Sequence, residues 1–323
     1  MTTSSRTGRL ALWTAQALIL GAVGWFAANR LGGEWSSLRP LLASVRPAWG
    51  GVLGSAVVVL GTYALLVESW RTLVRAWGDR LSFRDAARIW AVSNLGRYVP
   101  GKLWSIGAMG LMAQRAGVSP VAATGSAVIG TLVNLAAALA VVFVAGGGVA
   151  RVLFPQLGTA AAALPVVGIT GLVLTPFLIP LAARVAARLT RREPPAARVP
   201  ARALAVLVAA NVASWVGYGL AFEWLSVSLV PEIATDHLAY VAVFAGSYLA
   251  GYLALVVPGG WGVREAFLIA GLTGLGLADA PTATLLAVSS RLWLTMLELA
   301  PGLTYLLVGA APLPPRPTTD ANT

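Results

Sequence analysis

Long apolar stretches dominate the chain and alternate with short polar segments. Six of these stretches have the roughly 18 or more mostly apolar residues that a bilayer-spanning helix needs. They cover residues 10–28, 49–69, 119–146, 164–183, 203–229 and 282–311. The pattern predicts an all-α polytopic membrane protein with about six full spans.

Two further apolar stretches, about 86–114 and 239–277, are interrupted by Pro and Gly. The interruptions read Leu95-Gly96-Arg97-Tyr98-Val99-Pro100-Gly101-Lys102-Leu103-Trp104 and Val256-Val257-Pro258-Gly259-Gly260-Trp261-Gly262-Val263-Arg264-Glu265. Pro and Gly end or kink a helix, and non-helical backbone at membrane depth needs protein or water around it. Two readings stay open: re-entrant helical hairpins packed among the spans, or kinked helices that cross fully, with 239–277 forming two short spans.

The polar segments orient the chain. Residues 70–88 and 184–202 are rich in Arg, whereas 230–237 holds Glu232 and Asp236 and no Lys or Arg. The positive-inside rule puts the basic segments, and with them the N-terminus, in the cytoplasm. Within 70–88, Arg71 or Arg75 is expected to pair with Glu68 at the membrane interface.

If the interrupted stretches are re-entrant hairpins, each half of the chain has the order span, span, hairpin, span. Because each half then crosses the membrane three times, the second half starts from the opposite face and is inverted relative to the first. We expect one membrane domain over 1–323, with the first half at 10–146 (hairpin 86–114) and the second at 164–311 (hairpin 239–277). Paired interruptions in corresponding parts of two halves point to a transport site.

Composition narrows the function. The chain is 58% hydrophobic and 11% charged, which excludes a soluble domain, and the net charge of +11 fits cytoplasmic loops near anionic lipid rather than nucleic acid. The absence of Cys and the single His237, expected to be solvated, argue against disulfides, thiolate catalysis and a His-based metal site. We expect no cofactor and no metal. The apolar run after Arg6 and Arg9 lacks a clean cleavage site, so a retained first helix is favoured over a signal peptide.

A Pro-Gly break starts a second half-helix whose free backbone N–H groups favour anions. Arg97 and Lys102 flank this start in the first break, and Arg264 follows it in the second. The sequence therefore predicts an anionic headgroup site near the midplane, with a backbone anion site at Gly101, Gly259 and Gly260. In the alternative reading, Arg97 and Lys102 extend to the interface and touch bulk lipid.

Charged residues in the second half complete the candidate site. Ionisable side chains inside a membrane are costly and usually face a protein interior or a water path. Arg291 and Glu298 are such residues in the last span, and Glu265 is expected to partner a cation on another segment. One possible arrangement pairs Arg291 with Glu265 and Glu298 with Arg264. They either hold two elements together or line a pathway. Trp104 and Trp261 follow the breaks and are candidates to wall the cavity, whereas Asn94, Asn134 and Asn211 are expected to make hydrogen bonds between helices.

These motifs resemble the lysylphosphatidylglycerol synthase transmembrane family, a flippase-like membrane region. The resemblance covers about 10–310 and lies in Asn94–Trp104 with Gln114-Arg115-Ala116-Gly117-Val118, in Val257–Ala266, and in Ser290-Arg291-Leu292-Trp293 with Glu298. Family members often carry charged residues in the span after the first motif, whereas Val128–Asn134 has none here. The soluble aminoacyl-transferase domain of the synthases is absent from this sequence.

The resemblance implies lipid translocation in the bacterial cytoplasmic membrane, with membrane lipids of anionic or polyprenyl-phosphate type as partners and oligomerisation open. Arg97, Lys102, Arg264 and Arg291 would bind the headgroup, and Glu265 and Glu298 would balance charge or carry protons. The alternatives are a membrane-embedded glycosyl- or acyl-transferase and an accessory subunit. The sequence offers a transferase little support, because it lacks a paired set of loop carboxylates outside the Arg-rich segment.

Overall fold

A computed structural model of the protein describes residues 43, 45–98, 103–146, 156, 159–160, 163, 166–174, 200–254 and 260–308. Every regular element in these residues is helical, so the prediction of an all-α protein is confirmed for them. The elements are α2 (Trp49–Ala76), α3 (Phe83–Asn94), the 3-10 helix η1 (Leu95–Tyr98), α4 (Leu103–Arg115), α5 (Pro120–Ala145), α8 (Ala201–Leu229), α9 (His237–Leu253), α10 (Val263–Gly274) and α11 (Ala280–Val308).

Four of the predicted spans are confirmed as helices long and apolar enough to cross a membrane. They cover Trp49–Ala76, Ala122–Ala145, Ala201–Leu229 and Ala280–Leu307. Their outward side chains include large apolar residues such as Leu53, Val57 and Met296, as a lipid-facing surface requires. The predicted span 10–28 lies outside the described residues, and 164–183 is described only at 166–174, which is helical.

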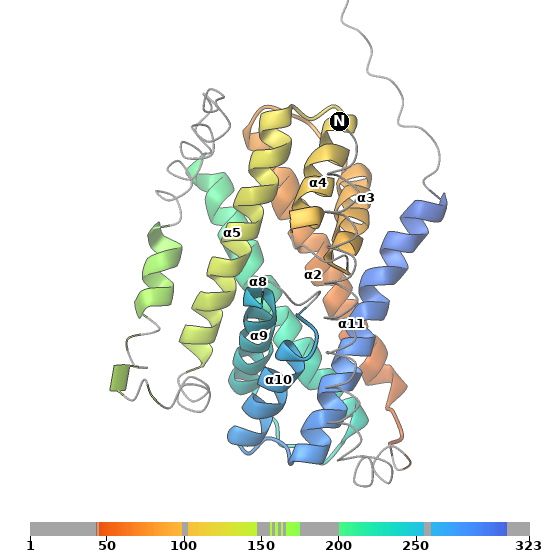
Figure 1. Cartoon of the computed structure of the whole chain (residues 1–323), viewed down its shortest axis with the longest axis vertical. Coiled ribbons are helices and arrows are strands. Elements are labelled where there is room, and N and C mark those ends of the chain that lie inside the picture. The colour runs from red at the N-terminus through yellow and green to blue at the C-terminus, as the bar shows by residue number, and fades with distance from the viewer. Residues whose placement is uncertain are drawn as a thin grey trace, which may run out of the picture.

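Each interrupted stretch is a pair of short helices that pack against each other. Helix α3 contacts α4 in the upper half of Figure 1, and α9 contacts α10 in the lower half. At 1.5 Å per residue, α3, α4 and α10 are roughly 18–20 Å long and α9 roughly 26 Å, short of the roughly 30 Å hydrocarbon core. The two pairs therefore approach the middle of the molecule from opposite ends (Figure 1).

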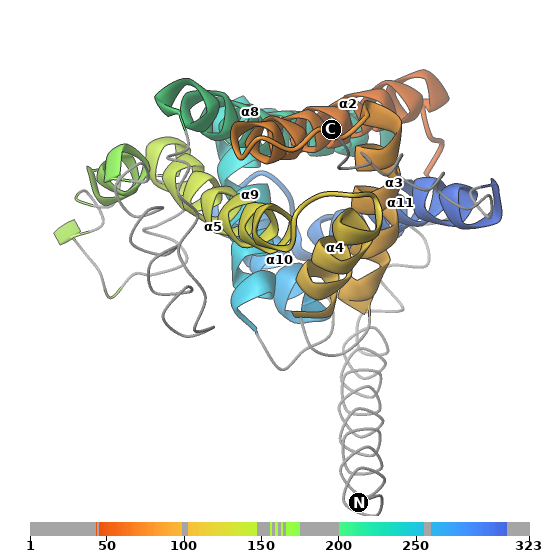
Figure 2. The same ribbon diagram turned by 90° about the horizontal axis from the view of Figure 1, so that it is seen from above.

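Small residues allow the long helices to pack closely. Helices α2 and α8 lie side by side along one flank of the molecule (Figure 2), where a side chain at Gly217 would come within 2.7 Å of Thr62. Close approach through Gly, Ala and Ser is the usual way in which membrane helices associate. A cluster that includes Phe222, Tyr240 and Leu286 then joins α8, α9 and α11.

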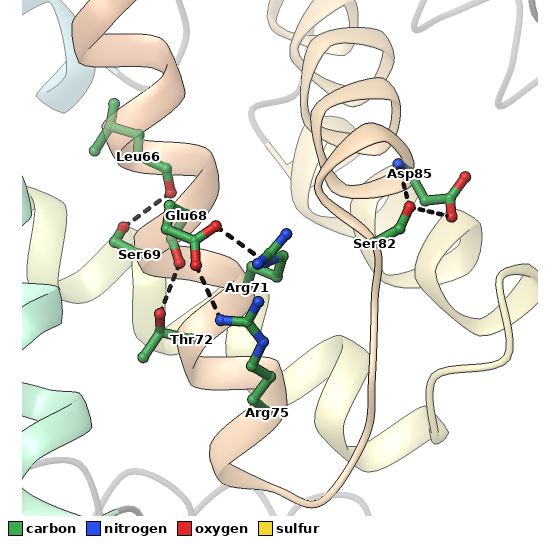
Figure 3. A network of polar contacts seen from close by, with 8 residues as sticks. All are labelled: Leu66, Glu68, Ser69, Arg71, Thr72, Arg75, Ser82 and Asp85. Carbon is green, nitrogen blue, oxygen red and sulfur yellow. Dashed lines mark hydrogen bonds and ion pairs between the residues drawn. The ribbon is translucent and has the colours of Figure 1, made fainter.

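The two ends of the helix bundle carry different capping residues. At the Arg-rich end, the Ser82 hydroxyl accepts a hydrogen bond from Asp85 N–H at the start of α3, and Glu68 lies 3.0 Å from Arg71 and 2.9 Å from Arg75 (Figure 3). The predicted partners of Glu68 are thereby confirmed. At the opposite end, the carboxylates of Asp236 and Asp279 cap α9 and α11. Carboxylates near helix N-termini stabilise them by accepting free N–H groups.

Candidate functional site: a polar cavity between the helix pairs

A cavity of about 240 Å³ lies between the two short helix pairs and the long helices. Its lining includes Asn94 and Ser105 from the first pair and Tyr248 and Arg264 from the second. The volume is far above the roughly 10–15 Å³ that one water molecule needs. The two interrupted stretches, more than 100 residues apart in the sequence, thus line one cavity, whose wall combines apolar side chains with several polar and charged ones.

Arg264 is the most deeply buried cation in the described lining. It is 4% exposed, and its guanidinium lies 5.1 Å from the Phe244 ring and 5.2 Å from the Tyr248 ring. Its Nε and Nη2 atoms are buried and make no hydrogen bond to any described residue. Aromatic faces attract a guanidinium but leave its N–H donors unsatisfied. Buried N–H donors of a charged group are costly to leave unsatisfied, so these two donors suit an anionic ligand in the cavity.

The glycines of the second motif set the position of Arg264. Gly260 and Gly262 have φ values of 66° and 79°, in the left-handed region that favours glycine. A side chain at Gly260 would lie 2.6 Å from the Gly251 carbonyl oxygen, and one at Gly251 would lie 3.0 Å from the Arg264 Cβ. The end of α9 and the segment before α10 are therefore in backbone contact at Gly251 and Gly260. This contact holds Arg264 against α9, in the wall of the cavity.

Glu265, which follows Arg264 in the sequence, caps the start of α10. Its Oε2 accepts a hydrogen bond of 2.7 Å from the Gly262 N–H, and because Gly262 has no side chain, this is one arm of a capping box. The same carboxylate lies 3.6 Å from Arg291 Nη1, so the expected pairing of Glu265 with Arg291 is confirmed. Since the Gly262 N–H already has an acceptor, an anion at the start of α10 would bind beside this group rather than to it.

The remaining candidate residues divide into four groups. Arg291 and Glu298 line the cavity together with Arg264. Trp261 lies outside that lining; it is 47% exposed, and its ring is 5.0 Å from the Arg291 guanidinium. Arg97 lies in η1 and Trp104 lies in α4, but the structure does not describe their side chains. Three predicted residues are outside the described part altogether: Gly101, Lys102 and Gly259.

Neutral polar side chains form a part of the cavity wall that the sequence did not indicate as a site. The expected hydrogen bond between helices is present, because Asn134 Nδ2 donates to Asn211 Oδ1 at 2.9 Å. Trp215 Nε1 donates to the Asn134 carbonyl at 3.0 Å. The wall also contains hydroxyl and aromatic residues that are ordinary within membrane helices, so no sequence signal set them apart. They include Tyr63, Ser69, Trp90, Ser93, Ser126, Thr131, Tyr218 and Tyr248.

A hydrogen-bonded pair of Glu223 and His237 lies outside the cavity, near the acidic end. The Glu223 carboxylate is buried in α8 and lies 2.6 Å from Nδ1 of His237, the exposed first residue of α9. The hydrogen bond and the negative charge of Glu223 raise the pKa of His237 above 6.5. His237 is thus exposed as expected, but it also links α8 to the start of α9. Among the residues described, no three His, Cys, Asp or Glu side chains gather as a metal site.

The fold defines an α-helical, multi-pass membrane protein with a cavity between its two interrupted helical segments and its long helices. A comparison with protein families matches residues 13–299 to the family described as "Lysylphosphatidylglycerol synthase TM region". The chain belongs to this family, which confirms the resemblance of its two Pro-Gly motifs. No curated protein matched the chain in a sequence search.

Proposed function

We propose that the protein is a lipid flippase that moves an anionic or phosphate-linked lipid between the leaflets of the bacterial cytoplasmic membrane. Membership of the family supports a role in lipid modification or transport. The observation that carries the proposal is Arg264, a buried cation in the cavity wall whose Nε and Nη2 lack hydrogen-bond partners among the described residues. A phosphate oxygen is the acceptor that these donors suit, because charge-assisted hydrogen bonds to phosphate are short and strong.

The size of the cavity limits what enters it. Ligand pockets for drug-sized molecules hold roughly 300–1,000 Å³, so about 240 Å³ accommodates a headgroup but not a whole lipid. The headgroup would leave the interface and bind at Arg264, while the acyl chains stay in the bilayer. Burying the headgroup phosphate against a guanidinium lowers the cost of carrying a charge across the hydrocarbon.

An inverted repeat would provide alternating access to this site. The α3–α4 pair and the α9–α10 pair would be re-entrant hairpins from the cytoplasmic and outer sides, with the N-terminus in the cytoplasm. The Arg-rich segment before α3 and the acidic caps of α9 and α11 support this orientation. Rocking of one half against the other would open the cavity to each leaflet in turn.

Several charged residues would share the binding of the headgroup. Arg97, Lys102 and Arg291 would add positive charge around Arg264, and Trp104 would close the first break against the ligand. Glu265 and Glu298 would balance the charge when the site is empty, and Glu265 also fixes the start of α10. Transport of an anion by such a site needs Arg264 above all, since Arg291 already has Glu265 as a partner.

Exchange of a fluorescent phospholipid between leaflets of proteoliposomes tests the proposal. Arg264→Gln keeps hydrogen-bond donors but removes the charge, and we expect exchange to slow more than tenfold, because a hydrogen bond to a charged group contributes about 1.5–3 kcal/mol. Arg80→Gln is the matched control, since Arg80 is an exposed arginine in the segment between α2 and α3. Equal exchange by the wild type, Arg264→Gln and protein-free vesicles would refute the proposal.

A further inference from the structure

The Arg-rich end of the molecule has a hollow of its own, apart from the cavity between the helix pairs. It measures about 680 Å³ and is lined by Arg71 and Arg75 of α2 together with residues 78–82, which lead to α3. Pockets of roughly 300–1,000 Å³ hold small ligands, so a headgroup fits this hollow. The described linings of the hollow and the cavity share no residue.

Glu68 positions both arginines of this hollow. One of its carboxylate oxygens lies 3.0 Å from Nε of Arg71, and the other accepts a hydrogen bond of 2.9 Å from Nη1 of Arg75. The two guanidinium groups therefore lie beside one carboxylate (Figure 3). Each guanidinium has five N–H donors, so a single contact to Glu68 does not use them up. The Phe83 ring lies 5.8 Å from the Arg71 guanidinium and gives it a second contact.

Positive charge predominates around the hollow. Residues 68–88 contain five arginines and three carboxylates. Each of these carboxylates already accepts a hydrogen bond from a protein group. The three pairs are Glu68 with Arg75, Asp79 with Ser119, and Asp85 with Ser82. The excess of guanidinium groups therefore favours an anion in the hollow, and phosphate is the anion that their planar donors suit well.

An exposed apolar face of α2 leads from this hollow into the membrane. Val57 is 68% exposed and Leu60 is 42% exposed. Side chains three, four, seven or eight residues apart share a face of a helix, so Leu60 lies on the same face as Glu68 and the two arginines. At 1.5 Å per residue, Val57 and Arg71 are roughly 21 Å apart along the helix. This is about the depth of one leaflet in a bilayer roughly 40–45 Å thick.

We propose that this face of α2 binds one anionic phospholipid of the leaflet at the Arg-rich end, as a lipid that stays with the protein and is not transported. Its phosphate accepts hydrogen bonds from Arg71 and Arg75, and an acyl chain lies along Leu60 and Val57. The bound lipid thereby joins the end of α2 to the turn before α3. This site is separate from the cavity and goes beyond the proposed lipid exchange.

The apolar face favours a lipid over a soluble phosphate compound. It puts the two arginines at the depth where the phosphates of the surrounding phospholipids lie, so these phosphates are always close to the hollow. A soluble compound would have to compete with them from solution. Net positive charge around the hollow in turn favours an anionic lipid over a zwitterionic one.

Native mass spectrometry of the purified full-length protein tests this site, with phosphatidylglycerol and phosphatidylcholine of identical acyl chains as probes. We expect phosphatidylglycerol to bind more tightly. The double variant Arg71→Gln, Arg75→Gln should weaken its binding about 25-fold, because each basic residue near a membrane surface contributes roughly a factor of five. If the double variant does not fold, Arg75→Gln alone changes an exposed side chain and should weaken binding about fivefold.

Two further variants separate this site from other binding. Arg84→Gln is the matched control, since Arg84 is an exposed arginine of α3 outside the described lining of the hollow. Arg264→Gln removes the buried cation of the cavity, and the loss caused by the double variant should be the same in the Arg264→Gln protein as in the wild type. Soluble glycerol 3-phosphate should not displace the lipid at an equal concentration.

Several results would overturn the proposal. They are phosphatidylcholine binding as tightly as phosphatidylglycerol, an equal loss in Arg84→Gln and the double variant, and wild-type binding in the double variant. Displacement of the lipid by glycerol 3-phosphate would assign the hollow to a soluble phosphate compound and would also contradict a lipid site. Exchange between leaflets tests the flippase proposal separately, so either proposal can fail without the other.

Discussion

One carboxylate oxygen of Glu265 lies 3.6 Å from Arg291 Nη1, and the other accepts a hydrogen bond of 2.7 Å from the Gly262 N–H. Glu265 thus joins α11 to the start of α10. Arg264 is its neighbour in sequence, so the same short segment contains a paired carboxylate and a buried cation with unsatisfied donors. Among the described lining residues, the pairing of Arg291 with Glu265 leaves Arg264 as the cation with two unsatisfied donor atoms.

Substitutions of Glu265 should separate its capping role from its charge. Glu265→Gln retains an oxygen that can accept from Gly262, whereas Glu265→Ala loses both the cap and the charge. We expect Glu265→Ala to be less stable than Glu265→Gln by about 1 kcal/mol, a typical contribution of a helix cap. Thermal unfolding in detergent compares the stabilities of the two variants. Equal melting temperatures would show that the cap contributes nothing to stability.

The backbone contact between α9 and α10 should tolerate no side chain. A Cβ at Gly260 would meet the Gly251 carbonyl and would force an unfavourable positive φ, so Gly260→Ala should destabilise the protein by about 1–3 kcal/mol and slow lipid exchange. Gly61→Ala is the control, because nothing lies within 4 Å of a Cβ there. Normal exchange by Gly260→Ala would mean that this contact does not set the position of Arg264.

Protonation of His237 should stabilise the folded protein. Glu223 raises the pKa of His237 above 6.5, its value in an unfolded chain, so the contribution is fully present below about pH 6.5. It is lost as the pH rises through the higher pKa of the folded state. Melting curves from pH 5.5 to 8.5 should therefore decline more for the wild type than for His237→Gln. If the two melting temperatures change with pH in parallel, protonation of His237 does not stabilise the folded protein.

The amide pair that links α5 and α8 should show a measurable coupling energy. Asn134→Leu and Asn211→Leu each break the bond of 2.9 Å between the two side chains. A double-mutant cycle should give about 0.6 kcal/mol, the average for hydrogen bonds between membrane helices, and at most about 1.7 kcal/mol. Additive effects of the two substitutions on unfolding would mean that the pair does not couple the helices.

The sequence predicted the long helices well because each has its own signal. Span 203–229 and helix α8 (Ala201–Leu229) agree within two residues, since apolar length alone defines a span. The interrupted stretches were harder, because Pro and Gly permit a kink as well as a hairpin. Only the contacts of α3 with α4 and of α9 with α10 show that each stretch folds into a packed pair.

The candidate site was predictable in its charged part. Arg264 and Arg291 stand out because charges are rare in apolar segments, and both line the cavity. Ser93 and Thr131 carry no such signal, since a hydroxyl in a membrane helix usually bonds to its own backbone, as these do. Their shared orientation toward one cavity depends on the packing of α3 against its neighbours, which no short motif encodes.

A structure of the protein in lipid nanodiscs containing phosphatidylinositol would test the site most directly. We expect headgroup density in the cavity, with a phosphate oxygen within hydrogen-bond distance of the Arg264 guanidinium and acyl chains outside the helix bundle. The Arg264→Gln variant in the same lipid should lose this density. A cavity without lipid in the wild type, with the Nε and Nη2 donors of Arg264 bonded instead to protein groups, would contradict a headgroup site at this residue.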